Sequence, residues 1–142
     1  MKKRNQNYAN HRRFVTGYHF IMYTLVMLIL IAGVVVAVKA PKPMLGGFIL
    51  LNGVSLVLIT FFARYFALRA QDRAIRAEEN FRYYILTGKP LSSGLRLGQI
   101  IALRFAGDDE YLALAERAEK EKLSANEIKK SIKNWKGDYH RV

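Results

Sequence analysis

Few residues in this 142-residue sequence have the types and the spacing that catalysis or metal binding requires. His11 and His19 are about two helical turns apart, which is a weak hint of a metal or haem site, but no carboxylate lies near them. Residues 108–110 read Asp-Asp-Glu and could bind a cation, although acidic residues are common at helix starts for dipole reasons.

Other chemical signatures are missing from the sequence. It has no cysteine, no Gly-rich phosphate loop, no zinc-protease HExxH helix and no G-x-S-x-G nucleophile elbow. We therefore expect no catalytic residues, no metal, no cofactor and no small-molecule substrate.

Two long uncharged segments dominate the first half of the chain. Residues 14–38 and 43–63 contain no Asp, Glu, Lys or Arg and are apolar all round. A bilayer core of ~30 Å needs about 20 residues of helix, so each segment is long enough to cross it. A cleaved signal peptide is the alternative for the first segment, but its apolar run is too long and a second run follows at once.

The connector between these segments is very short and contains Pro41 and Pro43, which end one helix and restart the next. We expect an all-α protein, a transmembrane helical hairpin followed by a small cytoplasmic helical region. Its predicted parts are a basic cytoplasmic arm (1–13), a first transmembrane helix (14–38), an external loop (39–43), a second transmembrane helix (44–66), a cytoplasmic extension helix (67–88), and short amphipathic helices with a tail (89–142).

The net charge of +12 is concentrated near the predicted spans. The arm contributes five positive charges, the loop two, and residues 64–107 a further five, whereas residues 108–142 are neutral. Lys and Arg accumulate on the cytoplasmic side of membrane proteins, so both termini should be cytoplasmic. We expect the arginines beside the spans to contact anionic lipid headgroups, rather than nucleic acid: Arg12, Arg13, Arg64, Arg69, Arg73 and Arg76.

Small and polar residues inside the spans are candidates for an intramembrane interface, because small residues let helices approach closely in lipid. They serve either to pack the hairpin or to dock another protein: Gly33, Ala37, Gly46, Gly47, Asn52, Gly53 and Ser55. Asn52 is the most informative, since an unpaired amide is costly near the middle of a span. We find no strong partner for it in the chain, which favours a bond across a subunit interface.

Helix signals continue beyond the spans. Residues 64–86 predict a helix. Small and aromatic residues at helical spacing form its apolar face: Ala67, Ala70, Ala74, Ala77, Phe81, Tyr84 and Ile85. Gly88 and Pro90 end this helix. A short helix is expected over 95–105, another after Asp108 as its N-cap, and a last one that ends at Gly137.

The last helix has the clearest local signal. Ser124 and Glu127 form a capping box, and Leu123 with Ile128 forms a hydrophobic staple. Ile128, Ile132 and Trp135 should provide the apolar side of this helix.

Several segments resemble an uncharacterised family of short bacterial two-span membrane proteins. They are residues 86–91, 99–106, 108–110, 128–130 and 132–135, and the resemblance is most specific from Leu86 onward. It implies a bacterial cytoplasmic (inner) membrane location with several spans, and carries over no site residues. Gln99, Arg104 and Trp135 are candidates for cytoplasmic docking. The alternative is that these residues belong to a packed helical core, in which Arg104 forms an ion pair with Asp108 or Asp109.

Three functions remain open. The leading hypothesis is a non-enzymatic accessory or scaffold subunit of a larger membrane complex, with other membrane proteins and an anionic bilayer as partners. The alternatives are a membrane-tethered binding protein for the ribosome or nucleic acid, suggested by the basic segments, and a homo-oligomeric transporter or channel with Asn52 and Ser55 facing a lumen.

Overall fold

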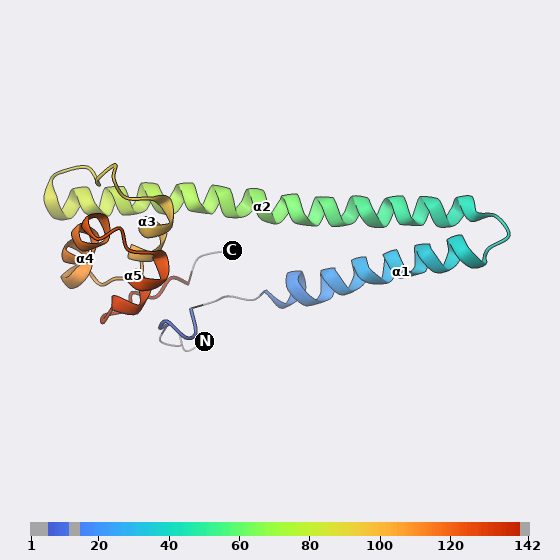
Figure 1. Cartoon of the computed structure of the whole chain (residues 1–142), viewed down its shortest axis with the longest axis horizontal. Helices are drawn as coiled ribbons and strands as arrows, with labels where there is room; N and C mark the ends of the chain where they lie inside the picture. Colours follow the sequence, from blue (N-terminus) through green and yellow to red (C-terminus); the bar gives the residue numbers. More distant parts are fainter. Residues whose placement is uncertain (1–5, 12–14, 140–142) are drawn as a thin grey trace. The chain divides into compact units, whose positions relative to one another are not determined.

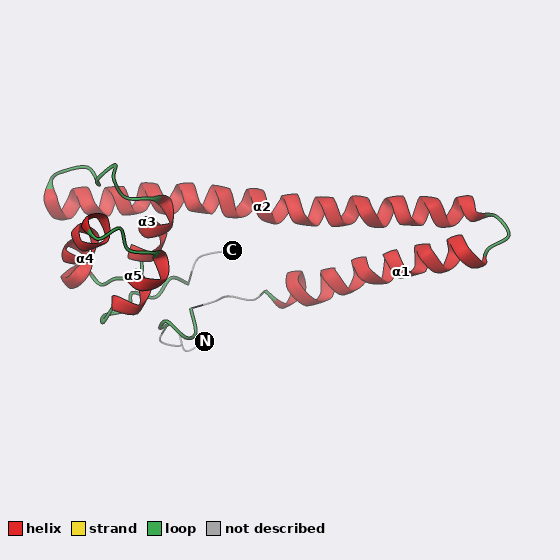
Figure 2. Ribbon diagram, in the orientation of Figure 1, coloured by secondary structure: helices red, strands yellow, loops and turns green. Residues whose placement is uncertain are grey.

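The structure is a computed structural model that describes residues 6–11 and 15–139 (Figure 1). Arg12 and Arg13, two of the predicted headgroup contacts, lie outside the described residues. The described residues form helices and no strand, so the all-α prediction is confirmed (Figure 2). In chain order the elements are the π-helix η1 (Gly17–Met22), α1 (Tyr23–Lys39), α2 (Pro43–Thr87), α3 (Leu97–Leu103), α4 (Asp108–Lys120) and α5 (Ala125–Ser131).

The chain divides into two compact units. One comprises residues 13–67, and the other combines residues 1–12 with residues 68–142. The long helix α2 supplies residues to both, as the absence of Gly and Pro between Gly53 and Gly88 allows. We call them the hydrophobic unit and the helical unit.

The hydrophobic unit contains η1, α1 and the first part of α2. Pro43 is the first residue of α2, a position where proline is favoured because its missing N–H has no partner in a helix anyway. Helices Gly17–Lys39 and Pro43–Thr87 are both long and apolar enough to cross a membrane. Only 11% and 17% of their most apolar windows are buried. Their apolar side chains are therefore mostly on the surface, unlike those of a core helix in a water-soluble protein.

The helical unit has a core of its own. Helices α3, α4 and α5 pack together, and the largest fully buried side chains are those of Leu103, Phe105, Tyr111 and Ile128. The apolar residues predicted for α4 are all buried, namely Tyr111, Leu114, Ala115 and Ala118. These helices are short, so they depend on packing against one another and against the last turns of α2.

The sequence predicts an apolar face on the last turns of α2, but α2 packs against this core with its opposite face. Ile75 and Glu79 are buried, each with 6% exposure, and Tyr83 packs on the core. Phe81 and Ile85, on the predicted apolar face, are 65% and 66% exposed. A charged residue, Glu79, is therefore buried where an aromatic face was available.

Several helix ends differ from the predicted ones, and α3 spans Leu97–Leu103 instead of residues 95–105. The N-cap of α4 is Gly107, and Asp108 is the first helical residue; its carboxylate accepts a hydrogen bond from Nε of Arg82. Helix α5 ends at Ser131, six residues before Gly137. The Glu110 carboxylate accepts the backbone N–H groups of Lys133 and Asn134 at 2.9–3.1 Å, which removes both from any helical ladder.

The predicted start of α5 is confirmed. The hydroxyl oxygen of Ser124 accepts the Glu127 N–H at 3.3 Å, and the Ser124 N–H donates to the Glu127 carboxylate at 2.7 Å. Leu123 and Ile128 belong to the same hydrophobic core, as a staple requires.

Candidate interaction surfaces

Four of the predicted intramembrane residues lie where α1 contacts α2. A Cβ atom added to Gly33 would lie 2.9 Å from Cγ of Leu50. One added to Gly46 would overlap the backbone of Ala37, and one added to Gly53 would lie 2.6 Å from Leu30. Gly33, Ala37, Gly46 and Gly53 thus allow the two helices to approach closely, the role we expected for hairpin packing.

The other three predicted intramembrane residues lie on the outer surface of the helix pair. A Cβ atom at Gly47 would meet nothing within 4 Å. Ser55 is exposed and its hydroxyl donates to the Leu51 carbonyl oxygen at 2.8 Å, so it is satisfied by its own helix. The Asn52 side chain is also exposed, and within the described residues it has no hydrogen-bond partner. Asn52 is thus a polar group on this surface that a partner could satisfy.

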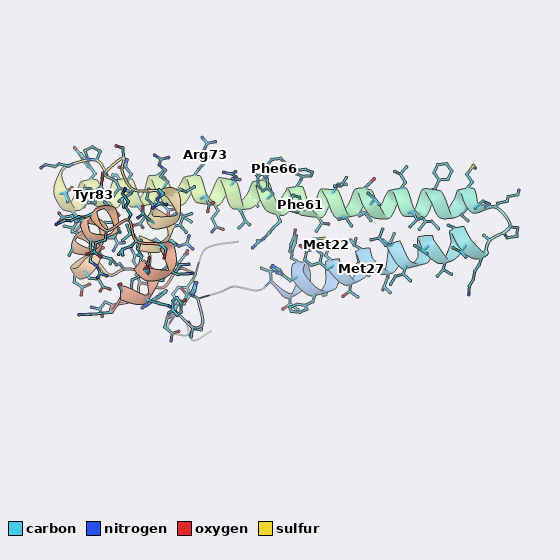
Figure 3. All side chains as sticks on the ribbon, in the orientation of Figure 1. Met22, Met27, Phe61, Phe66, Arg73 and Tyr83 are labelled. Atoms are coloured by element: carbon cyan, nitrogen blue, oxygen red, sulfur yellow. The ribbon has the colours of Figure 1, made fainter. Side chains whose placement is uncertain are left out.

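Aromatic residues gather near one end of the hydrophobic unit. The Tyr18 hydroxyl donates to the Thr60 carbonyl oxygen at 2.6 Å, and the Arg64 guanidinium lies 5.7 Å from the centre of the Tyr18 ring. The rings of Phe61 and Tyr65 stack at 6.3 Å, and Figure 3 shows Phe61 and Phe66 projecting from α2. Rings with polar edges beside an arginine are typical of a membrane–water boundary.

Gln99, one of the predicted docking residues, lies inside the helical unit. It is 4% exposed. Its amide nitrogen donates to the carbonyl oxygens of Ala118 and Leu123 at 2.8 and 2.9 Å, and its oxygen accepts the Arg96 N–H at 2.8 Å. The docking prediction is wrong for Gln99, because its side chain holds α3 against the end of α4 and does not reach the surface.

Arg104 is also largely enclosed, with a 9% exposed side chain. Its Nε lies 3.2 Å from a carboxylate oxygen of Asp138, and its guanidinium lies 4.6 Å from the Phe105 ring centre. The expected ion pair with Asp108 or Asp109 is wrong. Asp108 pairs with Arg82, and Asp109 accepts a hydrogen bond from Asn134.

Trp135 is half-buried in an aromatic cluster. Its ring lies 5.1 Å from that of Phe105 and 5.8 Å from that of His11. Lys129 Nζ lies 3.5 Å from Nε2 of His11 and 5.9 Å from the Phe105 ring centre. Trp135 thus packs against the core, and residues of the N-terminal arm cover part of it, a contact that the sequence did not predict.

The arm is held in a second place. The Gln6 amide donates to the Asp138 carbonyl oxygen at 3.0 Å and accepts the Asp138 N–H at 2.9 Å. The side-chain amide of Gln6 therefore forms two hydrogen bonds with the backbone of Asp138. The sequence could not predict these hydrogen bonds, because the two residues are 132 positions apart.

A polar network around Arg82 is the main feature that sequence reasoning missed. Arg82 pairs with Glu79 at 3.2 Å and with Asp108 at 2.5 Å, and it also donates to the Ala106 carbonyl oxygen at 2.7 Å. Its guanidinium lies 4.1 Å from the Tyr111 ring centre. Burial raises the pKa of Glu79, whereas the Arg82 hydrogen bond lowers the pKa of Asp108. The network joins α2 to the start of α4.

A shallow cavity of about 250 Å³ opens beside this network. Its polar lining combines acids and bases, including Glu78, Glu79, Arg104, Lys136 and Asp138. The charges largely compensate one another, so the cavity has no single-sign field with which to select an anion or a cation. The acids of residues 108–110 are all engaged in bonds within the unit.

The remaining predicted headgroup residues lie along α2. Arg64 is half-buried, and Arg69, Arg73 and Arg76 are exposed. No group of His, Asp or Glu within the described residues could hold a metal ion. His19, in η1, contacts the backbone of Val15, two residues before that helix, at 3.1 Å.

Comparison with known proteins gives one match. No curated protein and no solved structure matches the chain. The model of a family of unknown function, DUF6526, matches residues 1–142, and the chain therefore belongs to this family.

Proposed function

We propose that this protein is a non-enzymatic accessory or scaffold subunit, anchored in a bacterial inner membrane by two spans and associated with other membrane proteins. The outward position of Asn52 is the observation that carries the proposal. A side-chain amide that faces lipid without a hydrogen-bond partner costs free energy. A polar partner on another subunit removes this cost.

The exposed apolar surface supports the membrane anchor. Large side chains such as Phe48 and Leu51 are 61% and 63% exposed on α2, and Ile31 is 54% exposed on α1. An apolar surface of this extent would aggregate in water but is suited to lipid.

The charge distribution supports an orientation with both termini in the cytoplasm. The connector between α1 and α2 contains only Lys39 and Lys42. The opposite side has the arginines from Arg64 onward and the basic arm. An excess of Lys and Arg retains that side in the cytoplasm.

Cysteine labelling tests this topology, because the natural chain has no cysteine. The two variants are Lys42→Cys and Ser93→Cys. Position 42 lies in the connector, and position 93 lies in an exposed turn of the helical unit. We expect a membrane-impermeant maleimide to label K42C in intact cells and S93C only after permeabilisation. The reverse pattern would contradict the proposed orientation.

Substitution of Asn52 tests the association with other subunits. Asn52→Ala should reduce co-purification of membrane partners in mild detergent, while Ser55→Ala should not, because the Ser55 hydroxyl is bonded to Leu51 in its own helix. One interhelical amide bond is worth about 0.6–2 kcal/mol, which corresponds to a severalfold loss of association. Equal recovery of partners with N52A and the natural chain would count against Asn52 as a subunit contact.

A further inference from the structure

The face of α2 opposite Ile75 and Glu79 is exposed, although Ala74 borders the cavity lined by Arg104 and Ala77 borders a second cavity lined by residues 90–93. Five exposed residues lie along it at alternating spacings of four and three: Ala70, Ala74, Ala77, Phe81 and Tyr84. Phe81 is 65% and Tyr84 56% exposed. An alternation of four and three is the heptad spacing of a coiled-coil seam. We call these five residues the α2 seam.

Charged residues flank the α2 seam at the positions where coiled coils form ion pairs. With Ala74 and Phe81 at the a positions of the heptad, Arg73 is a g residue and Glu78 is an e residue. Both are exposed, and the described structure gives neither an ion pair within the chain. Figure 3 shows Arg73 pointing away from α3, α4 and α5.

We propose that a second copy of this chain covers the α2 seam, forming a parallel two-stranded coiled coil. In a parallel pair, a g residue meets the e residue five positions later on the partner helix. Arg73 of each copy then meets Glu78 of the other, which gives two identical ion pairs related by the two-fold axis.

The same positions disfavour an antiparallel pair. There g residues face g residues, and the g positions in this stretch are Arg73 and Asn80, neither of which carries a negative charge. Three alanines at the seam let the two backbones approach closely, and the exposed rings of Phe81 and Tyr84 supply apolar area at its end.

Two heptads are too few for a stable soluble coiled coil. In this respect the inference rests on the proposed membrane anchor, because confinement to one membrane raises the effective concentration of the two copies and aligns them in parallel. The second copy would contact residues 70–84, a different segment of α2 from the one that carries Asn52.

Disulfide cross-linking of the full chain in phosphatidylethanolamine–phosphatidylglycerol vesicles tests the seam. Single variants Ala74→Cys and Ala77→Cys should form cross-linked dimers on mild oxidation. Arg76→Cys is the matched control, since it is exposed on the same helix but lies off the seam. Equal cross-linking at all three positions, or at none, would overturn the proposal.

Charge reversal tests the register and the direction. Arg73→Glu alone and Glu78→Arg alone should each weaken self-association about tenfold, because two attractive pairs become repulsive. The double variant R73E/E78R should recover to within about twofold of the natural chain. Energy transfer between labelled copies measures each dissociation constant, and circular dichroism confirms that each variant retains its helices.

Mixing the two single variants provides a sharper result. Copies with R73E should pair preferentially with copies carrying E78R, because that combination restores both ion pairs of the parallel dimer, whereas each single variant paired with itself has like charges at these positions. A double variant as weak as the single ones, or no preference in the mixture, would overturn the proposal. Quenching of the fluorescence of a Phe81→Trp variant by brominated lipid would also overturn the proposal, because it would show that the α2 seam contacts the bilayer.

These outcomes are separable from the proposed function. Labelling of K42C and S93C reports topology whether or not copies associate, and co-purification with N52A reports other subunits. A monomeric chain with the expected topology would therefore reject the dimer while leaving the accessory role intact.

Discussion

The guanidinium of Arg82 lies 4.1 Å from the centre of the Tyr111 ring and forms ion pairs with Glu79 and Asp108. The Tyr111 hydroxyl lies 3.3 Å from the Glu79 carbonyl oxygen, to which it donates. The Arg82 side chain is 11% exposed and that of Glu79 is 8% exposed. A single arginine thus connects α2 with α4 in a largely dry environment, where the removal of one charge leaves the other uncompensated.

We expect Arg82→Gln to destabilise the helical unit by about 3 kcal/mol, since it leaves Glu79 buried without its partner. Thermal unfolding in detergent, followed by circular dichroism, measures this loss. Arg76→Gln is the control, because Arg76 is exposed on the same helix and lies off the α2 seam. Equal unfolding temperatures for the two variants would show that the network contributes little.

The two acids of this network should respond to pH in opposite ways. Because the pKa of Glu79 is raised by burial, the folded protein holds that proton more tightly, and the contribution of Glu79 to stability falls as the pH rises through this range. Because the pKa of Asp108 is lowered by Arg82, its contribution is present above its ordinary pKa and is lost as the pH falls.

Unfolding temperatures of Glu79→Gln and Asp108→Asn between about pH 3 and about pH 7 check these signs. Relative to the natural chain, E79Q should gain stability as the pH rises and D108N should lose it. A shift of both variants in the same direction would be inconsistent with the opposed pKa changes.

Adjacent glycines in the hydrophobic unit form a matched pair of substitutions. Gly46→Ala should cost about 1–3 kcal/mol because the new methyl group would overlap the Ala37 backbone and push α1 from α2. Gly47→Ala should be neutral or stabilising by up to about 1 kcal/mol, since its Cβ meets open space. Thermal aggregation in detergent distinguishes them, and equal effects would argue against the close approach of the two helices.

The capping box of α5 is open to a local test. Ser124→Ala should destabilise the helical unit by about 1 kcal/mol, because the Glu127 N–H loses its acceptor. The Ser124 backbone N–H holds the pKa of Glu127 below its ordinary value, so the other half of the box weakens as the pH falls through that lowered pKa. Ser93→Ala, in an exposed turn, is the control, and an equal loss there would exclude a capping effect.

The sequence by itself determined the features that depend on residues close along the chain. The two apolar segments, the restart of a helix at Pro43, the buried side of α4 and the capping box at Ser124 were all predicted, because helix periodicity and caps act within a few residues.

Only the tertiary structure decided which distant groups meet. Arg104 pairs with Asp138 rather than with Asp108, because Arg82 reaches Asp108 from α2. Helix α5 stops at Ser131 because the Glu110 carboxylate of α4 accepts the backbone N–H groups that follow. Helix α2 buries Glu79 rather than Phe81 because Arg82 pairs with the Glu79 carboxylate and the Tyr111 hydroxyl donates to the Glu79 carbonyl oxygen. Such pairings depend on the free energy of the assembled core, to which residues far apart in the sequence contribute together.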